Sequence, residues 1–127
     1  MVLGSGYIGF EIAAAFSKQA SHVTVLSNSK FPLEKLIGIT VGEALLELHK
    51  KAGVQFVSYY GEIEFKSDSG KLSAVRVNST DYEADCCIIA KGVKPNTIFL
   101  SDSGIEMSNG GFIFVDEVST HANSMLV

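Results

Sequence analysis

The pattern of apolar and polar positions at the start of the chain predicts a strand, a helix and a second strand. Residues 1–3 are an apolar stub shorter than an ordinary central strand, which indicates that the chain begins inside a strand. Residues 7–18 carry apolar side chains at helical spacing, and residues 22–26 form a β-branched run typical of a buried strand. These segments predict one βαβ unit. The apolar positions of its helix are Ile8, Ile12, Ala15 and Phe16, and the small residues Gly9 and Ala13 are expected to lie close to a sheet.

A second helix is predicted to begin at a capping box formed by Thr40 and Glu43, whose side chains can satisfy exposed N–H groups at a helix start. It is expected to end at Gly53, a residue suited to the left-handed position that closes many helices. A third strand is expected at residues 54–57. The apolar face predicted for this helix consists of Val41, Leu45, Leu48 and Ala52.

Residues 59–84 change to short alternating runs separated by turn clusters, which predicts an antiparallel meander. Residues 85–90 form a continuous apolar run typical of a strand covered on both faces, and residues 112–115 predict one more short strand. The predicted fold class is therefore α/β: a Rossmann-like three-layer domain with a central parallel sheet, flanking helices and an antiparallel β-meander. No linker or repeat is evident, so residues 1–127 are interpreted as a single domain.

Composition and charge narrow the classes of function. The chain has 127 residues, 46% of them hydrophobic, which is enough to bury a core without metal or disulfide support. A formal net charge of −4 argues against nucleic acid and anionic membrane surfaces as partners. The sequence has neither a membrane span nor a secretory signal pattern, so we expect a soluble, intracellular protein, with a cytoplasmic or a mitochondrial location left open.

Side chains typical of metal or nucleophilic chemistry are scarce. Cys86 and Cys87 are adjacent in an apolar run, so we interpret both as buried thiols and not as a redox pair or a bridge. The three histidines are scattered without other ligands at suitable spacing, and no metal site is expected. Motifs for hydrolase, phosphoryl-transfer and disulfide chemistry are absent, so no catalytic residue is assigned.

The strongest chemical signal is a Gly-x-Gly-x-x-Gly motif between the apolar stub and the first helix. Gly4 permits a tight turn, Gly6 lets the backbone approach a pyrophosphate, and Gly9 lets the helix pack on the strands. The helix N-terminus adds partial positive charge. The motif predicts a dinucleotide site, the alternative being a glycine turn that only packs. The residues assigned to the site are Gly4, Ser5, Gly6, Tyr7, Ile8 and Gly9.

The end of the second strand bears on the choice of nucleotide. NAD sites place a carboxylate there to hold the ribose hydroxyls, and this chain has Ser27. Asn28 and Lys30 follow, so the turn offers amide, hydroxyl and ammonium donors and no nearby acid. These donors favour NADPH. The preference is only slight, because arginine, the better phosphate ligand, is absent. The alternative is a solvated turn without selectivity.

Two further positions are ambiguous from the residues alone. Glu11 lies one turn inside the first helix, where a glutamate suits either a solvated surface or a ligand contact. Residues 92–96 follow an apolar strand, so they are either a cofactor-facing loop or an ordinary Gly/Pro turn.

Taken together, residues 2–13, 23–25 and 92–96 resemble the NAD(P)H-binding domain of the FAD-dependent pyridine nucleotide-disulfide oxidoreductase superfamily. The resemblance covers nearly the whole chain. Within the superfamily, residues 36–48, the meander and residues 103–115 are most similar to the apoptosis-inducing-factor-like and ferredoxin-reductase-like branch.

The resemblance implies a domain excised from a flavoenzyme, or a chain that has lost its flavin half. The family's FAD-binding glycine fingerprint is missing from residues 1–127, and the sequence stops at residues 124–127, where the family's return to the FAD domain would begin. FAD would then be held only in the full-length parent, and this chain would not turn over alone. By resemblance, Glu11 would bond the nicotinamide carboxamide, while Gly92, Val93 and Pro95 would shape the nicotinamide end of the site.

Two functions follow from the sequence. The first is binding of NADH or NADPH and, in the intact flavoenzyme, presentation of that nucleotide for hydride transfer to FAD, with the FAD domain as partner. The alternative is a non-catalytic dinucleotide-binding or protein-interaction module, whose exposed edges associate with partners or with a second copy.

Overall fold

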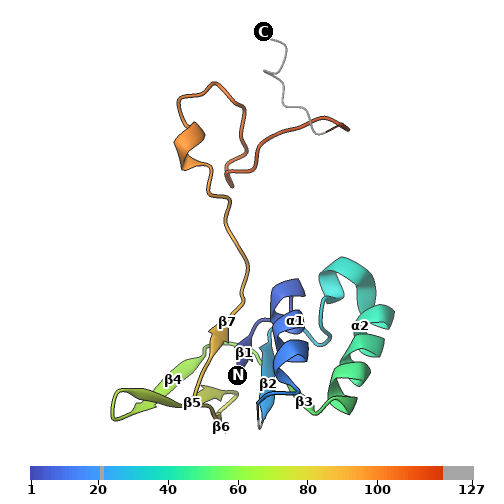
Figure 1. The fold of residues 1–127 in the computed structure, drawn as a ribbon, viewed down its shortest axis with the longest axis vertical. Coiled ribbons are helices and arrows are strands. Elements are labelled where there is room, and N and C mark those ends of the chain that lie inside the picture. Colours follow the sequence, from blue (N-terminus) through green and yellow to red (C-terminus); the bar gives the residue numbers. More distant parts are fainter. Residues whose placement is uncertain (21, 119–127) are drawn as a thin grey trace. The chain divides into compact units, whose positions relative to one another are not determined.

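The computed structural model describes residues 1–20 and 22–118 of the chain. The chain divides into two compact units after Gly92. A four-stranded parallel sheet with the order β3-β2-β1-β7 forms the centre of the first unit (Figure 1). Its strands are β1 (Val2–Leu3), β2 (Val23–Ser27), β3 (Val54–Ser58) and β7 (Ile88–Ile89).

Three layers make up this first unit, as the sequence predicts. Two helices lie on one side of the parallel sheet, and a three-stranded antiparallel sheet with the order β4-β5-β6 lies on the other (Figure 1). The helices are α1 (Tyr7–Phe16) and α2 (Glu34–Lys51), and the antiparallel strands are β4 (Glu64–Asp68), β5 (Lys71–Val77) and β6 (Thr80–Glu83).

Successive side chains of the parallel strands point to opposite faces of the sheet, so the first unit has two hydrophobic cores, one on each face. Val2 and Val25 are paired across β1 and β2 and pack with Ala13 of α1. Their neighbours Leu3 and Leu26 point to the opposite face and pack with residues of β5 such as Val75. Both faces of β1 and of the middle of β2 are covered, and the residues paired there are all apolar.

The face that α1 buries differs from the predicted one. Ile8, Ala15 and Phe16 are exposed, whereas Gly9, Phe10 and Ala13 are buried. The helix contacts the sheet through Gly9 and Ala13, as predicted, and through the partly buried Ile12, whereas the other three members of the predicted apolar stripe stay exposed. Phe10 fills the space beside them, where its ring stacks on His49 of α2 with centroids 3.7 Å apart.

Helix α2 begins six residues before the predicted capping box and is interrupted at Gly38, whose φ of 79° and ψ of 171° are not helical. Its predicted apolar face is also wrong, because Val41 and Leu48 are exposed and Gly42 and Leu46 are buried. Gly42 sets this orientation, since a Cβ there would lie 2.7 Å from the carbonyl oxygen of Pro32. The predicted end is confirmed by the positive φ of 84° at Gly53.

The prediction of a doubly covered strand at residues 85–90 is wrong, and so is the burial of both thiols. Only Ile88–Ile89 form β7, an edge strand paired with β1, and the Ile89 side chain is 64% exposed. Cys86 is exposed, while Cys87 packs against the second core, where burial raises the pKa of its thiol. Successive residues of an extended segment point to opposite sides, so only one thiol reaches the core.

The second unit contains the short 3-10 helix Ile98–Leu100 and little other regular structure among its described residues. Residues 112–115 do not form the predicted strand, and an isolated antiparallel bridge joins Met107 to Ile113 instead. The hydroxyl of Thr97 donates to the carbonyl oxygen of Gly111 at 2.7 Å. The apolar run at 112–115 is exposed, and among the described residues its backbone hydrogen bonds are limited to residues 106 and 108.

An ionic cluster joins the three antiparallel strands. Asp81 of β6 accepts hydrogen bonds from Arg76 Nε at 2.6 Å and from Lys66 Nζ at 2.7 Å. These bonds, the one from Arg76 first, lower the pKa of Asp81 to about 2. The cluster is exposed, so solvent screens it and its contribution to stability is modest.

We expect Asp81→Asn to weaken the acid dependence of stability. The pKa of Asp81 is lower in the folded state than the ordinary value of 3.8, so its ionised form stabilises the fold above that value. The stabilisation is lost as pH falls from about 4 toward 2. Thermal melts from pH 2 to pH 6 measure this, with Asp68→Asn as a control outside the cluster. Equal acid dependence in the two variants would contradict the expectation.

Candidate functional site

The turn between β1 and α1 requires glycine at two positions for steric reasons. Gly4 has a φ of +118°, and its N–H donates to the carbonyl oxygen of Leu26 at 2.9 Å. A Cβ on Gly4 would overlap the carbonyl oxygen of Ala90, and a Cβ on Gly9 would overlap that of Gly4. The tight turn and the close approach of the helix that the motif predicts are therefore both present.

Gly6 lies in a different environment. It is the exposed N-cap residue of α1, with extended φ and ψ of −74° and −175°, and a Cβ there would meet nothing within 4 Å. The cap has no side-chain hydrogen bond, and the first turn has no acidic residue. The first N–H groups of a helix have no acceptor within the helix and carry partial positive charge. This end of α1 thus offers donors and open space, which fits the pyrophosphate of a dinucleotide.

Ser27, at the end of β2, is buried and already hydrogen bonded. Its side chain is 1% exposed. Its Oγ lies 2.6 Å from Oγ of Ser5 in the glycine turn and accepts the N–H of Ser29 at 3.0 Å. The residue that occupies the usual carboxylate position is therefore a link between two backbone segments.

Two further hydrogen bonds hold the loop after β2 in place. The N–H of Leu33 donates to the carbonyl oxygen of Ser5 at 3.0 Å, and the hydroxyl of Ser58 donates to that of Ser29 at 3.1 Å. Leu33 takes a left-handed φ of 54°, which is rare for a bulky residue. Sequence reasoning missed Leu33 and Ser58, because neither residue type signals such a role.

The exposed side chains of this loop carry its charge. Asn28 and Lys30 are exposed, and Lys30 Nζ lies 5.2 Å from the centroid of the Phe31 ring. Glu34 is partly buried, and its Oε2 accepts the N–H of Phe31 at 3.2 Å. The loop therefore presents an amide and an ammonium group to solvent, while its carboxylate is bonded to the backbone.

The remaining predicted site residues are only partly brought together with the glycine turn. Glu11 is exposed on α1. Gly92, with a φ of +123°, follows two residues after Ala90, whose carbonyl faces Gly4. Val93 and Pro95 belong to the second unit, and their contact with the nicotinamide end stays a prediction.

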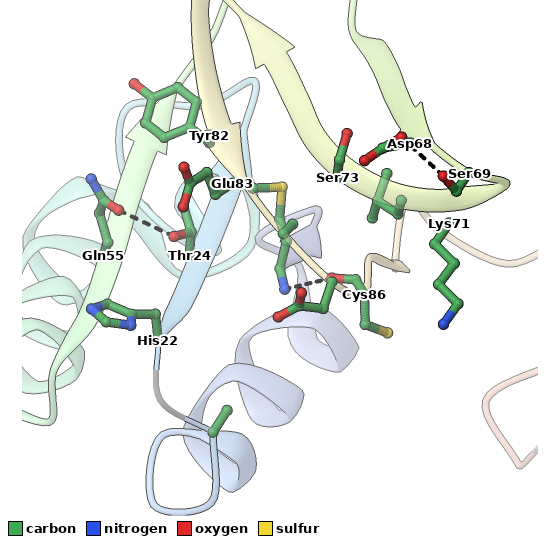
Figure 2. Close-up of a pocket in the computed structure, with 15 residues that line it drawn as sticks. His22, Thr24, Gln55, Asp68, Ser69, Lys71, Ser73, Tyr82, Glu83 and Cys86 are labelled. Atoms are coloured by element: carbon green, nitrogen blue, oxygen red, sulfur yellow. Dashed lines mark hydrogen bonds between the residues drawn. The ribbon is translucent and has the colours of Figure 1, made fainter.

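A pocket of about 840 Å³ lies elsewhere in the first unit (Figure 2). His22, Thr24 and Gln55 line it from the starts of β2 and β3, and Thr24 donates to Gln55 Oε1 at 3.1 Å. The glycine turn instead follows the carboxyl end of β1. Ligands of open α/β sheets bind outside the carboxyl ends of the strands, so this pocket is not the expected dinucleotide site.

Within residues 1–20 and 22–118, no helix is long and apolar enough to cross a membrane. Over the same residues, no group of three or more His, Cys, Asp or Glu side chains could hold a metal ion.

Comparisons with known proteins agree with the sequence resemblance. A family model described as pyridine nucleotide-disulphide oxidoreductase matches residues 1–123. Apoptosis-inducing factor 3 from Mus musculus is 33% identical over 119 residues, which cover 93% of this chain and 20% of that protein. Putidaredoxin reductase CamA from Pseudomonas putida is 34% identical over 113 residues, covering 87% of this chain and 27% of that protein.

A solved structure shares the fold. It is an engineered water-forming NADPH oxidase bound to NADPH, a mutant of the Lactobacillus brevis enzyme, with a TM-score of 0.76 and 27% identity. The match covers 96% of this chain and 27% of that one. This chain thus spans between 20% and 27% of the length of these relatives.

Proposed function

Because the chain belongs to the pyridine nucleotide-disulphide oxidoreductase family, we propose that its glycine turn binds the pyrophosphate of NADH or NADPH. The observation that carries the proposal is the environment of Gly6, which combines open space with the uncapped N-terminus of α1. In the whole protein, we expect an FAD domain to be the partner of this domain and FAD to accept the hydride.

The residues of this chain contribute binding and orientation. The bound nucleotide supplies a transferable hydride, which is cofactor chemistry and needs no acid or base from the protein. The first-turn N–H groups of α1 would bond the pyrophosphate oxygens, and the helix N-terminus would offset their charge. Gly4 and Gly9 keep that N-terminus close to the end of β1, where a bound nucleotide would lie at the carboxyl edge of the sheet.

The nicotinamide end is assigned to Glu11 and to the segment that begins at Gly92. Glu11 would accept a hydrogen bond from the carboxamide N–H, since its carboxylate lies on the solvent face of α1. Gly92 would line the same end, which the nearness of Ala90 to the glycine turn supports. For Val93 and Pro95 this role rests on the family resemblance alone.

Titration of the chain with NADH and with NADPH tests the proposal. Calorimetry should show saturable binding at one site per chain, with a dissociation constant between about 1 μM and 1 mM, the range in which enzymes commonly bind such substrates. Lysozyme at the same concentration serves as the control for heats of dilution. Absence of saturable heat with both nucleotides would contradict the proposal.

Exposed apolar side chains on α2 favour a second role, in protein interaction. Leu36, Ile39 and Leu48 are each more than half exposed, which is unusual for a helix that faces only water. These side chains would be covered by a partner domain or by a second copy of the chain. Sedimentation over a range of concentrations measures self-association, and a monomer at every concentration would argue against the second copy.

A further inference from the structure

Given the nucleotide binding proposed above, on which this inference rests, we propose that Ser27 is a positioning residue and not a nucleotide contact. Its hydroxyl bond to Ser5 holds the loop after β2 against the glycine turn. The exposed side chains of that loop then recognise the 2′-phosphate of a phosphorylated adenosine, so the site takes NADPH in preference to NADH.

The burial of Ser27 supports the first part of the proposal, that Ser27 does not contact the nucleotide. A ligand lying on the surface cannot reach a side chain that is 1% exposed and whose oxygen already bonds Ser5 Oγ and the N–H of Ser29. A carboxylate at this position would bond both ribose hydroxyls in an NAD site. This chain has no carboxylate at that position, so NADH lacks the hydrogen bonds to its ribose hydroxyls. NADPH carries a phosphate on the 2′ oxygen and does not depend on that carboxylate.

The hydrogen bonds around Ser27 support the second part of the proposal, that Ser27 positions the loop after β2. Ser5 is bonded through its hydroxyl to Ser27 and through its carbonyl oxygen to the N–H of Leu33. Ser58 holds the Ser29 carbonyl from the β3 side. The loop is therefore attached at two points to Ser5 of the glycine turn and at a third point to the end of β3. A change at Ser5 or at Ser27 breaks the same hydroxyl link.

The charges of the loop support the third part of the proposal, that the loop recognises the 2′-phosphate. Lys30 is the only cation between residues 27 and 34, and it is exposed beside the exposed amide of Asn28. Glu34 is the only acid in that segment, and one of its oxygens already accepts a backbone N–H. A phosphate dianion would gain charge-assisted hydrogen bonds here and meet no carboxylate at the strand end.

Two nucleotide fragments isolate this end of the site. Adenosine 2′,5′-bisphosphate and 5′-AMP lack the nicotinamide, so their binding depends on the first unit. We expect calorimetry of the chain to show the bisphosphate binding about tenfold more tightly than 5′-AMP at low salt, with a smaller ratio at moderate salt. Lys30→Gln should remove most of this ratio, and Glu34→Gln should increase it.

A double-mutant cycle tests the positioning role. Ser5→Ala and Ser27→Ala should each weaken both fragments by a similar factor of about five, and the double variant should bind no worse than either single variant. Ser27→Thr keeps the hydroxyl and should restore binding. Ser73→Ala, at an exposed position of β5, is the control, and circular dichroism melts establish that each variant folds. If Ser27→Ala does not fold, Ser5→Ala removes the same bond from the surface side.

Three outcomes would overturn the inference. Additive losses in the double variant would mean that Ser27 contacts the ligand by itself. Equal affinity for the two fragments would mean that the loop does not recognise the phosphate. A chain that binds NADH and NADPH equally overturns this inference alone, whereas a chain that binds neither fragment and neither dinucleotide overturns the proposed function as well.

Discussion

Gly6→Val should reduce the affinity for NADH and NADPH at least about hundredfold while the chain stays folded. The backbone of Gly6 is extended, a conformation that valine adopts readily, and a Cβ there meets nothing within 4 Å. The folded protein therefore accepts the side chain. The branched methyl groups would occupy the space in which the pyrophosphate approaches the backbone, so binding would be lost through direct overlap.

Calorimetric titration of the valine variant measures this loss, and a thermal melt shows whether the fold is retained. Gly6→Ala should bind with intermediate affinity, since one methyl group fills less of the same space. Ala14→Val places the same side chain on an exposed position of α1 and should leave affinity unchanged. A Gly6→Val variant that binds as tightly as the parent would show that the glycine turn does not contact the nucleotide.

Gly4→Ala should destabilise the fold by roughly 2–5 kcal/mol, combining a strained backbone with a steric overlap. The φ of +118° at Gly4 is rarely adopted by residues with a side chain, and the new Cβ would overlap the carbonyl oxygen of Ala90. Relief requires β1 and the segment after β7 to separate. Urea denaturation followed by circular dichroism measures the free energy of unfolding.

Gly53→Ala separates the cost of backbone strain from the cost of steric overlap. Gly53 also has a positive φ, 84°, but a Cβ there meets nothing within 4 Å, so its replacement should cost only about 1–2 kcal/mol. The excess cost at Gly4 then reports the overlap with Ala90. Equal costs at the two positions would contradict the tight packing of the glycine turn.

The βαβ unit and the meander could be predicted from sequence because local signals and tertiary packing agree there. Gly4 and Gly9 follow a spacing that only one kind of turn requires, and the structure gives each the predicted steric role. The polar turns between β4, β5 and β6 likewise fix antiparallel pairing through local chemistry.

The features that could not be predicted depend on tertiary contacts. Helical periodicity places Leu48 on an apolar face of α2, but the contact between Gly42 and the Pro32 carbonyl decides which face turns inward. Burial of Ser27 depends on Ser5, which is 22 residues away in sequence. Exposure of Ile89 follows from its edge strand, a property of strand order that an apolar run does not reveal.

Amide chemical-shift mapping by NMR tests the central claim most directly, since it locates the bound nucleotide without any substitution. On addition of NADPH, the largest shifts should occur at the amides of residues 4–9 and 28–30, around the glycine turn and the loop after β2. Shifts concentrated instead at His22, Gln55 and Asp85, which line the pocket at the opposite ends of the strands, would contradict the account.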